Sequence, residues 1–323
     1  MKGYLGKTYC LYLDQFAISN IVEDNAQWIK IKQLIEKGVA QNVLVCPMSA
    51  EHFLETAGKK EAGAIDHNDY FKKISGCLLL KPHAFITAQL LISSIRKNNI
   101  TKNTFLNKPN PAYIYKDSLQ KLRDTVSDFK GMIEEATTVS NEIRAAARDK
   151  KIESKMHESL MATTKAISLK EFTDRLQELL KTGGITIQGV KFEKREVPFW
   201  ADYIIDILIK KHKMNTLEGI KLLTKLNKEG FSGISTLEVR STLVGYMAVL
   251  QKKQTANDEI DLGRIASAMQ LSDCMVIDGA RKSEIIATGL DKKYGTKILS
   301  GKSDDVIELE KLLATIVPGR HAD

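Results

Sequence analysis

The sequence contains 323 residues and carries a formal net charge of +8 at pH 7, with 43% hydrophobic and 27% charged residues. This composition is typical of a globular protein with a sizeable core, and the length allows two lobes. No apolar segment is long enough to cross a bilayer, and the first residues lack the pattern of a secretory signal. We therefore expect a cytoplasmic protein without a membrane partner.

The four cysteines are not spaced like a metal site or a disulfide framework. Cys10, Cys46, Cys77 and Cys274 form no C-x-x-C pair, and three of them lie in apolar segments that we expect to be strands. We therefore interpret them as small buried hydrophobic residues and expect no zinc site.

The basic excess is confined to the middle of the chain. Residues 84–235 contain 26 Lys and Arg against 18 Asp and Glu, whereas the two flanking segments together contain 22 of each. This distribution favours a middle segment that binds a polyanion, with the chemistry in the flanks. A well-solvated helical surface would give the same count.

The first flank opens with a strand and a helix. The apolar residues 7–14 predict a buried strand that ends on Asp14. A helical period follows from Ile18 to Ile35, and Gly38 is expected to stop it.

A second strand and a second helix are expected next. Residues 43–46 predict the strand, and Ser49 is the expected N-cap of the helix. This helix carries Glu51 and Glu55 one turn apart on the same face. Residues 77–80 fit either a third strand or a buried helix end.

The middle segment has the pattern of a helical lobe. Apolar residues recur three and four apart over 119–133 and 169–179, which predicts a long helical hairpin or bundle. A small hairpin is expected over 185–192, followed by helices over 200–209 and 217–226. Because the segment contains no repeat and no low-complexity tract, we interpret it as an inserted lobe.

The second flank returns to alternating helices and strands. Helices are expected over 236–250, from Asp258 onward, after Asp278 and over 306–316, and strands over 275–277 and 296–299. This alternation is typical of a three-layer α/β/α fold with a mostly parallel central sheet. We predict a core made of residues 1–83 and 236–323, interrupted by a large all-α insertion over residues 84–235.

Acidic residues occur where the predicted strands end or the predicted helices start. They are Asp14, Glu51 or Glu55, Asp261, Asp273 and Asp278. Ligands of open α/β sheets bind at the carboxyl ends of the strands, where these carboxylates can meet. Carboxylates in close contact repel one another unless they bind a cation or a proton, and hard oxygen ligands favour Mg²⁺ or Mn²⁺. Such an ion can activate a water for in-line attack on a phosphodiester, so the predicted reaction cuts a nucleic-acid strand.

Each acid also has a structural explanation. Asp14 can cap the helix that follows it, and Asp258 and Asp261 stand at capping-box spacing at a helix start. The helix glutamates fit a solvated helix face, and Asp278 with the glycine after it fits an ordinary turn.

Three basic residues are expected near the mouth of the acidic cluster. Arg264 lies one turn beyond Asp261, and Arg281 and Lys282 follow Asp278 closely. Because arginine suits bidentate binding of phosphate, we predict contacts of these three residues with substrate phosphates. The structural alternative is surface solubility.

In order and spacing these features resemble the PIN-domain nucleases. Members of that family are metal-dependent nucleases, most often of RNA, with a three-layer α/β/α fold, and many are toxins of bacterial toxin–antitoxin pairs. The resemblance covers residues 5–83 and 236–316 and leaves the middle segment unexplained. It rests on the strand ending at Asp14, the helix glutamate, Asp261 with Ile265-Ala266-Ser267-Ala268 behind it, and the segment from Ser272 to Asp278.

The resemblance implies roles for single residues. Asp14, Asp261, Asp278 and either Glu51 or Glu55 would bind Mg²⁺ or Mn²⁺, and Asp273 would be a further ligand or support one. We prefer Glu55 over Glu51 as the catalytic helix glutamate, because polar residues surround it.

We therefore predict a PIN-like endonuclease with RNA as its preferred substrate. The resemblance also implies a toxin or defence effector with an inhibitory or activating protein partner, and the heptad-like helices allow a homo-oligomer. Two alternatives stay open: a structure-specific DNA nuclease, and a catalytically inactive binding or assembly module of PIN-like fold. An active site predicts carboxylates that converge, whereas a module permits them to point apart or to pair with Arg264 and Arg281.

Overall fold

A computed structural model describes most of the chain, and it divides the chain into two compact units. The described residues are 2–49, 52, 61–107, 141–142, 144–145, 154–182, 189–192, 195–198 and 200–317. Unit 1 comprises Met1–Lys81, Thr101–Val126 and Ser267–Asp323, and unit 2 comprises Pro82–Ile100 and Ser127–Ala266. Among the described residues, no helix combines the length and the apolar character needed to span a bilayer.

Unit 1 contains a four-stranded parallel sheet in the order β2-β1-β7-β8. The strands are β1 (Tyr9–Leu13), β2 (Leu44–Val45), β7 (Cys274–Val276) and β8 (Lys297–Leu299). Each is a short apolar segment that is almost entirely buried, as strands of a parallel sheet are when helices cover them. The predictions of a mixed α/β fold and of a parallel sheet are confirmed.

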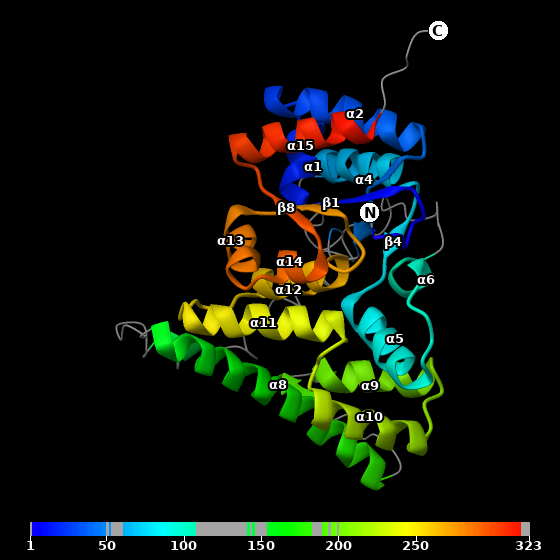
Figure 1. The fold of residues 1–323 in the computed structure, drawn as a ribbon, viewed down its shortest axis with the longest axis vertical. Coiled ribbons are helices and arrows are strands. Elements are labelled where there is room, and N and C mark those ends of the chain that lie inside the picture. Colours follow the sequence, from blue (N-terminus) through cyan, green and yellow to red (C-terminus); the bar gives the residue numbers. More distant parts are fainter. Residues whose placement is uncertain are drawn as a thin grey trace. The chain divides into compact units, whose positions relative to one another are not determined.

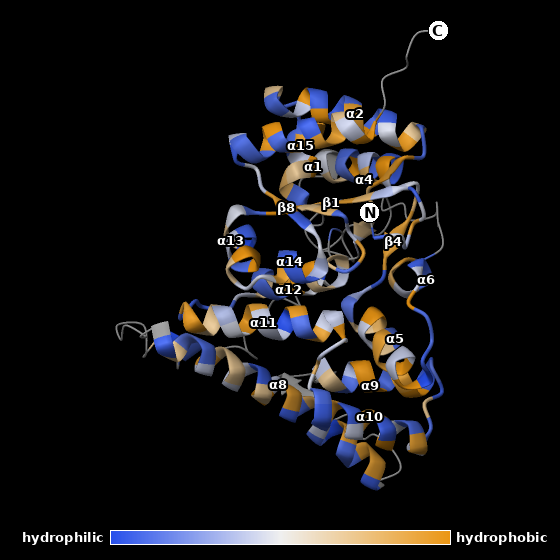
Figure 2. Ribbon diagram, in the orientation of Figure 1, coloured by the Kyte–Doolittle hydropathy of each residue, from blue (hydrophilic) through white to orange (hydrophobic). Residues whose placement is uncertain are grey.

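Unit 1 also contains helices, several of which pack against the sheet. They are α1 (Gln15–Val22), α2 (Ile29–Ala40), α4 (Glu61–Ser75), α13 (Gly279–Ala287), α14 (Leu290–Tyr294) and α15 (Ser303–Ile316), with the short helices η1 (Ala26–Trp28) and α6 (Lys102–Phe105). Alternate residues of a strand share one face of the sheet. Leu11, Leu13, Cys274 and Val276 accordingly form one buried core with apolar residues of α1, α2, α4 and α15. Figure 1 shows α2 and α15 side by side over this core, and Figure 2 shows hydrophobic and hydrophilic residues alternating along them.

Two details of this region differ from the predicted pattern. The helical period breaks at Asp24, whose φ of 52° is left-handed, so that α1 and α2 are separate helices. Gly38 does not stop the second helix, which continues to Ala40. A Cβ atom on Gly38 would lie 2.8 Å from Val317 and 3.0 Å from Leu44, so the glycine is needed for close packing rather than for a turn.

The third apolar segment forms a strand and not a helix end. In unit 1, β4 (Leu79–Leu80) pairs in parallel with β3 (Met48–Ser49) as a separate two-stranded sheet.

Unit 2 is mainly helical. Its helices are α5 (His83–Arg96), α8 (Ser154–Thr182), α9 (Trp200–Lys210), α10 (Thr216–Glu229), α11 (Ser235–Val249) and the larger part of α12 (Ala256–Ala268). A hairpin of β5 (Gly189–Phe192) and β6 (Arg195–Pro198) lies between α8 and α9 in the sequence. The helix predicted over 119–133 lies outside the described residues. We predicted that residues 236–323 form the second half of the core. In the structure, however, α11 and most of α12 belong to unit 2, the helical unit.

Polar contacts as well as apolar packing join the helices of unit 2. Arg175 of α8 donates two hydrogen bonds to Asp202 of α9, at 2.6 and 2.9 Å, and the Asp202 side chain is only 1% exposed. Phe172 packs against Trp200 beside this pair.

Candidate active site

Asp14 and Asp278 follow two neighbouring strands at the same edge of the unit 1 sheet. The β1–β7 register pairs Leu13 with Val276, so both acids leave the carboxyl edge of adjacent parallel strands. The N–H of Asp14 continues this ladder, donating to the Val276 carbonyl at 2.9 Å. The local sequence explains both positions, because each acid ends a short apolar strand and begins a helix.

Each of these carboxylates caps the helix after it. Asp14 Oδ1 accepts a hydrogen bond from Gln15 N at 2.6 Å, and Asp278 Oδ1 accepts from Ala280 N at 2.9 Å and Arg281 N at 3.1 Å. The two helix starts therefore hold the two carboxylates in place. Asp14 is buried, with 6% of its surface exposed, and Asp278 is half-buried.

The order of the strands reverses between β1 and β7. From β1 the chain continues to β2 on one side, and from β7 it continues to β8 on the other. In open α/β sheets, the crevice at the carboxyl ends of strands that diverge in this way is the usual ligand site.

A third group lies at the carboxyl end of β8. Asp305 accepts hydrogen bonds from Ser300 N at 2.8 Å, from the Ser300 hydroxyl and from Lys282 Nζ at 2.6 Å. Burial opposes the charge of Asp305, but the hydrogen bonds from Lys282 and Ser300 outweigh it and lower the pKa of this carboxyl below its ordinary value. Lys282, predicted as a phosphate contact, is thus held in an ion pair.

Lys302 also lies near the carboxyl edge of the unit 1 sheet, and we did not predict it from the sequence as a phosphate contact. Its side chain approaches Gly279, where a Cβ atom would lie 3.8 Å from Lys302 Cε, and it is exposed without an ion pair among the described residues. The preceding Gly301 passes close to Phe16, since a Cβ atom there would lie 2.9 Å from the ring. Its position three residues after the last predicted strand was the signal that could have identified Lys302.

The two arginines that we predicted to contact phosphate are buried, and each forms an ion pair. Arg264 is 3% exposed and forms an ion pair with Asp261, three residues before it in α12. Arg281 is 2% exposed and donates to Glu284 at 2.6 Å. Surface solubility, the alternative explanation of these side chains, does not apply to either of them.

Asp273 lies at the opposite, amino-terminal edge of the sheet, because it precedes β7 instead of following it. Its carboxylate accepts hydrogen bonds from Lys2 N at 2.7 Å and Cys10 N at 2.9 Å. The Lys2 ammonium donates to Met269 O and to Thr296 Oγ1 nearby. Asp273 is therefore not brought together with Asp14 and Asp278.

The remaining predicted ligands lie elsewhere. Asp261 belongs to unit 2, and Glu51 and Glu55 lie outside the described residues. Asp258 exchanges hydrogen bonds with Thr255 at the start of α12, with Thr255 N donating at 2.7 Å and Thr255 Oγ1 accepting from Asp258 N at 3.2 Å, which makes it part of a helix cap.

Other reactive side chains of unit 1 are buried in the core. His52 Nδ1 lies 3.0 Å from Ser49 N, and its Nε2 lies 3.4 Å from the Tyr12 hydroxyl. Burial raises the pKa of the Cys10 and Cys274 thiols to about 12, so both remain protonated and unreactive. The prediction of buried cysteines is confirmed for Cys10, Cys46 and Cys274, whereas Cys77 is half-buried.

The carboxyl edge of the sheet supplies two of the oxygen ligands that a hard cation needs, but no complete set among the described residues. Asp14 and Asp278 supply the carboxylate oxygens that Mg²⁺ and Mn²⁺ prefer. Within the described ranges, however, no three His, Cys, Asp or Glu side chains are grouped closely enough to bind a metal ion.

Comparisons with models of protein families, with curated proteins and with solved structures found no match to this chain.

Proposed function

We propose that this chain is a metal-dependent nuclease of PIN-like fold with its active site at the carboxyl edge of the unit 1 sheet. The observation that carries the proposal is the position of Asp14 and Asp278 after β1 and β7, the neighbouring strands between which the strand order reverses. A three-layer α/β/α arrangement of unit 1, with RNA as the preferred substrate, belongs to the same proposal.

Asp14 and Asp278 would hold the ion through their carboxylates, and the backbone N–H groups of α1 and α13 keep both side chains in position. Either Glu51 or Glu55, which lie outside the described residues, would complete the ligand set. When bound, Mg²⁺ or Mn²⁺ supplies Lewis-acid stabilisation of the phosphodiester and activation of a water.

Two lysines at the same edge have different proposed roles. Lys282 neutralises Asp305 and fixes the turn after β8, whereas the exposed Lys302 would attract a substrate phosphate. This assignment replaces our prediction that Lys282, Arg264 and Arg281 contact phosphate, since all three are held in ion pairs.

A second candidate is a binding or assembly module with a nuclease-like fold. It is favoured by the ion pair of Asp261 with Arg264 and by the role of Asp14 and Asp278 as helix caps. In such a module the acids would stabilise the fold and would not perform chemistry.

Cleavage assays with Asn variants separate the two candidates. Asparagine caps a helix about as well as aspartate but lacks the charge that binds a metal ion. Asp14→Asn and Asp278→Asn should therefore stay folded and lose at least about 100-fold in cleavage rate, because an active-site ion contributes several kcal/mol to stabilisation of the transition state. Asp304→Asn, a change of an exposed acid in the first turn of α15, is the matched control and should cut like the wild type.

The substrates are labelled single-stranded RNA, structured RNA and DNA, each with Mg²⁺, Mn²⁺ or EDTA. Cutting that requires metal supports the nuclease, and the preferred strand decides between a ribonuclease and a DNA nuclease. If the two variants cut as fast as the wild type, the site assignment fails. If the folded wild type cuts none of the substrates, the binding module replaces the nuclease.

A further inference from the structure

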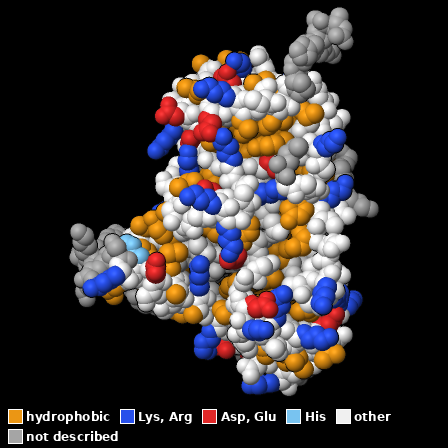
Figure 3. Space-filling view, viewed as in Figure 1, with side chains coloured by type: hydrophobic (Ala, Val, Ile, Leu, Met, Phe, Trp, Pro, Cys, Tyr) orange, Lys and Arg blue, Asp and Glu red, His pale blue; other side chains and the backbone are white. Residues whose placement is uncertain are grey.

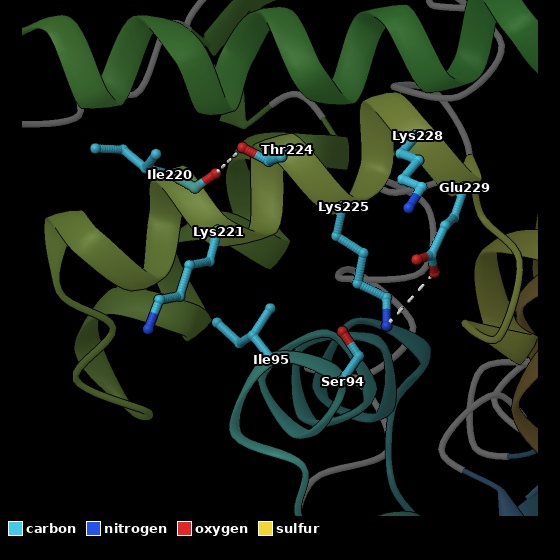
Figure 4. A pocket seen from close by; sticks show the side chains of 8 residues that line it. All are labelled: Ser94, Ile95, Ile220, Lys221, Thr224, Lys225, Lys228 and Glu229. Atoms are coloured by element: carbon cyan, nitrogen blue, oxygen red, sulfur yellow. Dashed lines mark hydrogen bonds and ion pairs between the residues drawn. The ribbon is translucent and has the colours of Figure 1, made fainter.

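A shallow groove of about 370 Å³ lies between α5 and α10 in unit 2. Figure 3 shows basic side chains, interspersed with fewer acidic ones, in the lower part of the view, where these two helices lie. Figure 4 shows that Lys221, Lys225 and Lys228 come from α10 and that Ile95 comes from the end of α5. The groove therefore has a row of lysines along one wall.

The three lysines share one face of α10. They are four and three residues apart, which places them at intervals of roughly 6 and 4.5 Å along the helix axis. Lys221 and Lys228 are exposed and form no ion pair within the described ranges, and Lys225 lies 3.6 Å from Glu229 in a pair that is largely solvated. Such a pair contributes little and leaves the lysine able to bind another anion.

A second acid on α10, Glu218, is paired with an arginine. Arg96 donates to both oxygens of Glu218, at 2.6 and 2.9 Å, and these bonds lower the pKa of Glu218 to about 2. The Glu218 charge is thereby balanced by Arg96, so the row of lysines keeps a net positive field.

The rest of the lining favours a polyanion over a protein helix. Ile95 and Ile220 are the aliphatic side chains of the groove, whereas a docked helix needs a series of apolar anchors one turn apart. Among the described residues that line it none is aromatic, so bases have no stacking platform and recognition would rest on the backbone.

We propose that this groove binds the phosphodiester backbone of a single nucleic-acid strand, independently of its sequence. That the bound strand is also the strand being cut rests on the proposed nuclease function. The groove belongs to a different unit from Asp14 and Asp278, so its binding of a strand can be measured separately from cleavage.

The test is binding of labelled 20-nucleotide RNA and DNA of the same sequence, measured by fluorescence anisotropy in EDTA so that no cutting occurs. Lys221→Gln, Lys225→Gln and Lys228→Gln are combined in one variant, and Lys170→Gln is the control, because Lys170 is an exposed lysine of the same unit that is paired with Asp174. Three lost phosphate contacts should reduce the slope of log affinity against log salt by about 2 and weaken binding at least about tenfold. Circular dichroism confirms that both variants fold.

Equal binding by the triple variant and the wild type would overturn the proposal, as would a wild type that binds neither strand. Stronger binding of poly-glutamate than of RNA, lost in the triple variant, would overturn it in favour of an acidic protein partner. Because these measurements need no cleavage, a protein that binds through the groove but cuts nothing would refute the nuclease and leave the groove assignment intact.

Discussion

Asp273 accepts a hydrogen bond from the main-chain N–H of Cys10 at 2.9 Å and so ties the amino-terminal end of β7 to β1. Its other oxygen accepts from the N–H of Lys2 at 2.7 Å. Asp273→Asn would turn one acceptor into a donor that faces an N–H group. We expect it to lower the free energy of unfolding by about 1–3 kcal/mol, measured by urea denaturation.

The same substitution should leave metal binding unchanged, because Asp273 lies at the other edge of the sheet from Asp14 and Asp278. Titration calorimetry with Mn²⁺ compares it with Asp14→Asn. A loss of Mn²⁺ affinity in Asp273→Asn without a loss of stability would show that Asp273 is a ligand after all.

Lys302→Gln should weaken binding of RNA about three- to tenfold and reduce the salt slope by about 0.7, the value for one phosphate contact on a single strand. The reason is that Lys302 is exposed beside Gly279 without an ion pair among the described residues. Lys311→Gln, at an exposed position of α15, is the control. Equal affinities of the two variants, measured in EDTA, would remove Lys302 from the site.

His83 should make the stability of unit 2 depend on pH. Its Nε2 atom is buried without a hydrogen-bond partner among the described residues, and burial together with the charge of Arg240 lowers its pKa from 6.5 to about 4. The unfolded chain therefore binds a proton more readily than the folded one. Stability from this group is complete above pH 6.5 and is lost as the pH falls from 6.5 toward 4.

Urea unfolding at pH 7 and pH 5 measures this effect. Wild type should lose about 2 kcal/mol more than His83→Gln between these two values. Other titrating groups contribute equally to both proteins and cancel in the difference. An identical loss in both would mean that His83 does not titrate abnormally.

Two helix glycines of unit 1 should respond oppositely to alanine. At Gly38 a Cβ atom would lie 2.8 Å from Val317 and 3.0 Å from Leu44, whereas at Gly63 it would meet nothing within 4 Å. Gly38→Ala should destabilise by about 1–3 kcal/mol through overpacking, despite its better helix propensity. Gly63→Ala should stabilise by up to about 1 kcal/mol, and thermal unfolding of both variants checks the pair.

Much of unit 1 could be predicted from sequence because its strands are short apolar segments buried on both faces. That pattern identified β1, β2, β7 and β8, and with them the parallel sheet. The break at Asp24 was missed, although the polar residues Glu23, Asp24 and Asn25 interrupt the apolar period between Val22 and Trp28 and were the signal for a turn. Gly38 was misleading for a different reason, since a glycine that permits close packing looks the same in sequence as one that ends a helix.

The candidate site was predictable at the strand ends and not beyond them. Asp14 and Asp278 lie where the rule for parallel strands places them. The same rule applied strictly would have put Asp273 at the other edge, because it stands before its strand. The pairing of Arg264 with Asp261 and of Arg281 with Glu284 depends on side-chain direction within a helix turn, which residue spacing permits but does not determine.

The pairing of β1 with β7 also determines when the sheet of unit 1 can form during synthesis of the chain. Cys10 and Asp273, which join them, are 263 positions apart in the sequence, and all of unit 2 is synthesised between them. Until β7 emerges, β1 has one unpaired edge, which is an aggregation risk that a nascent chain must survive. For the same reason the carboxylates of the proposed site cannot meet before β7 and Asp278 have been made, so a nascent chain that ends before Asp278 lacks the proposed site.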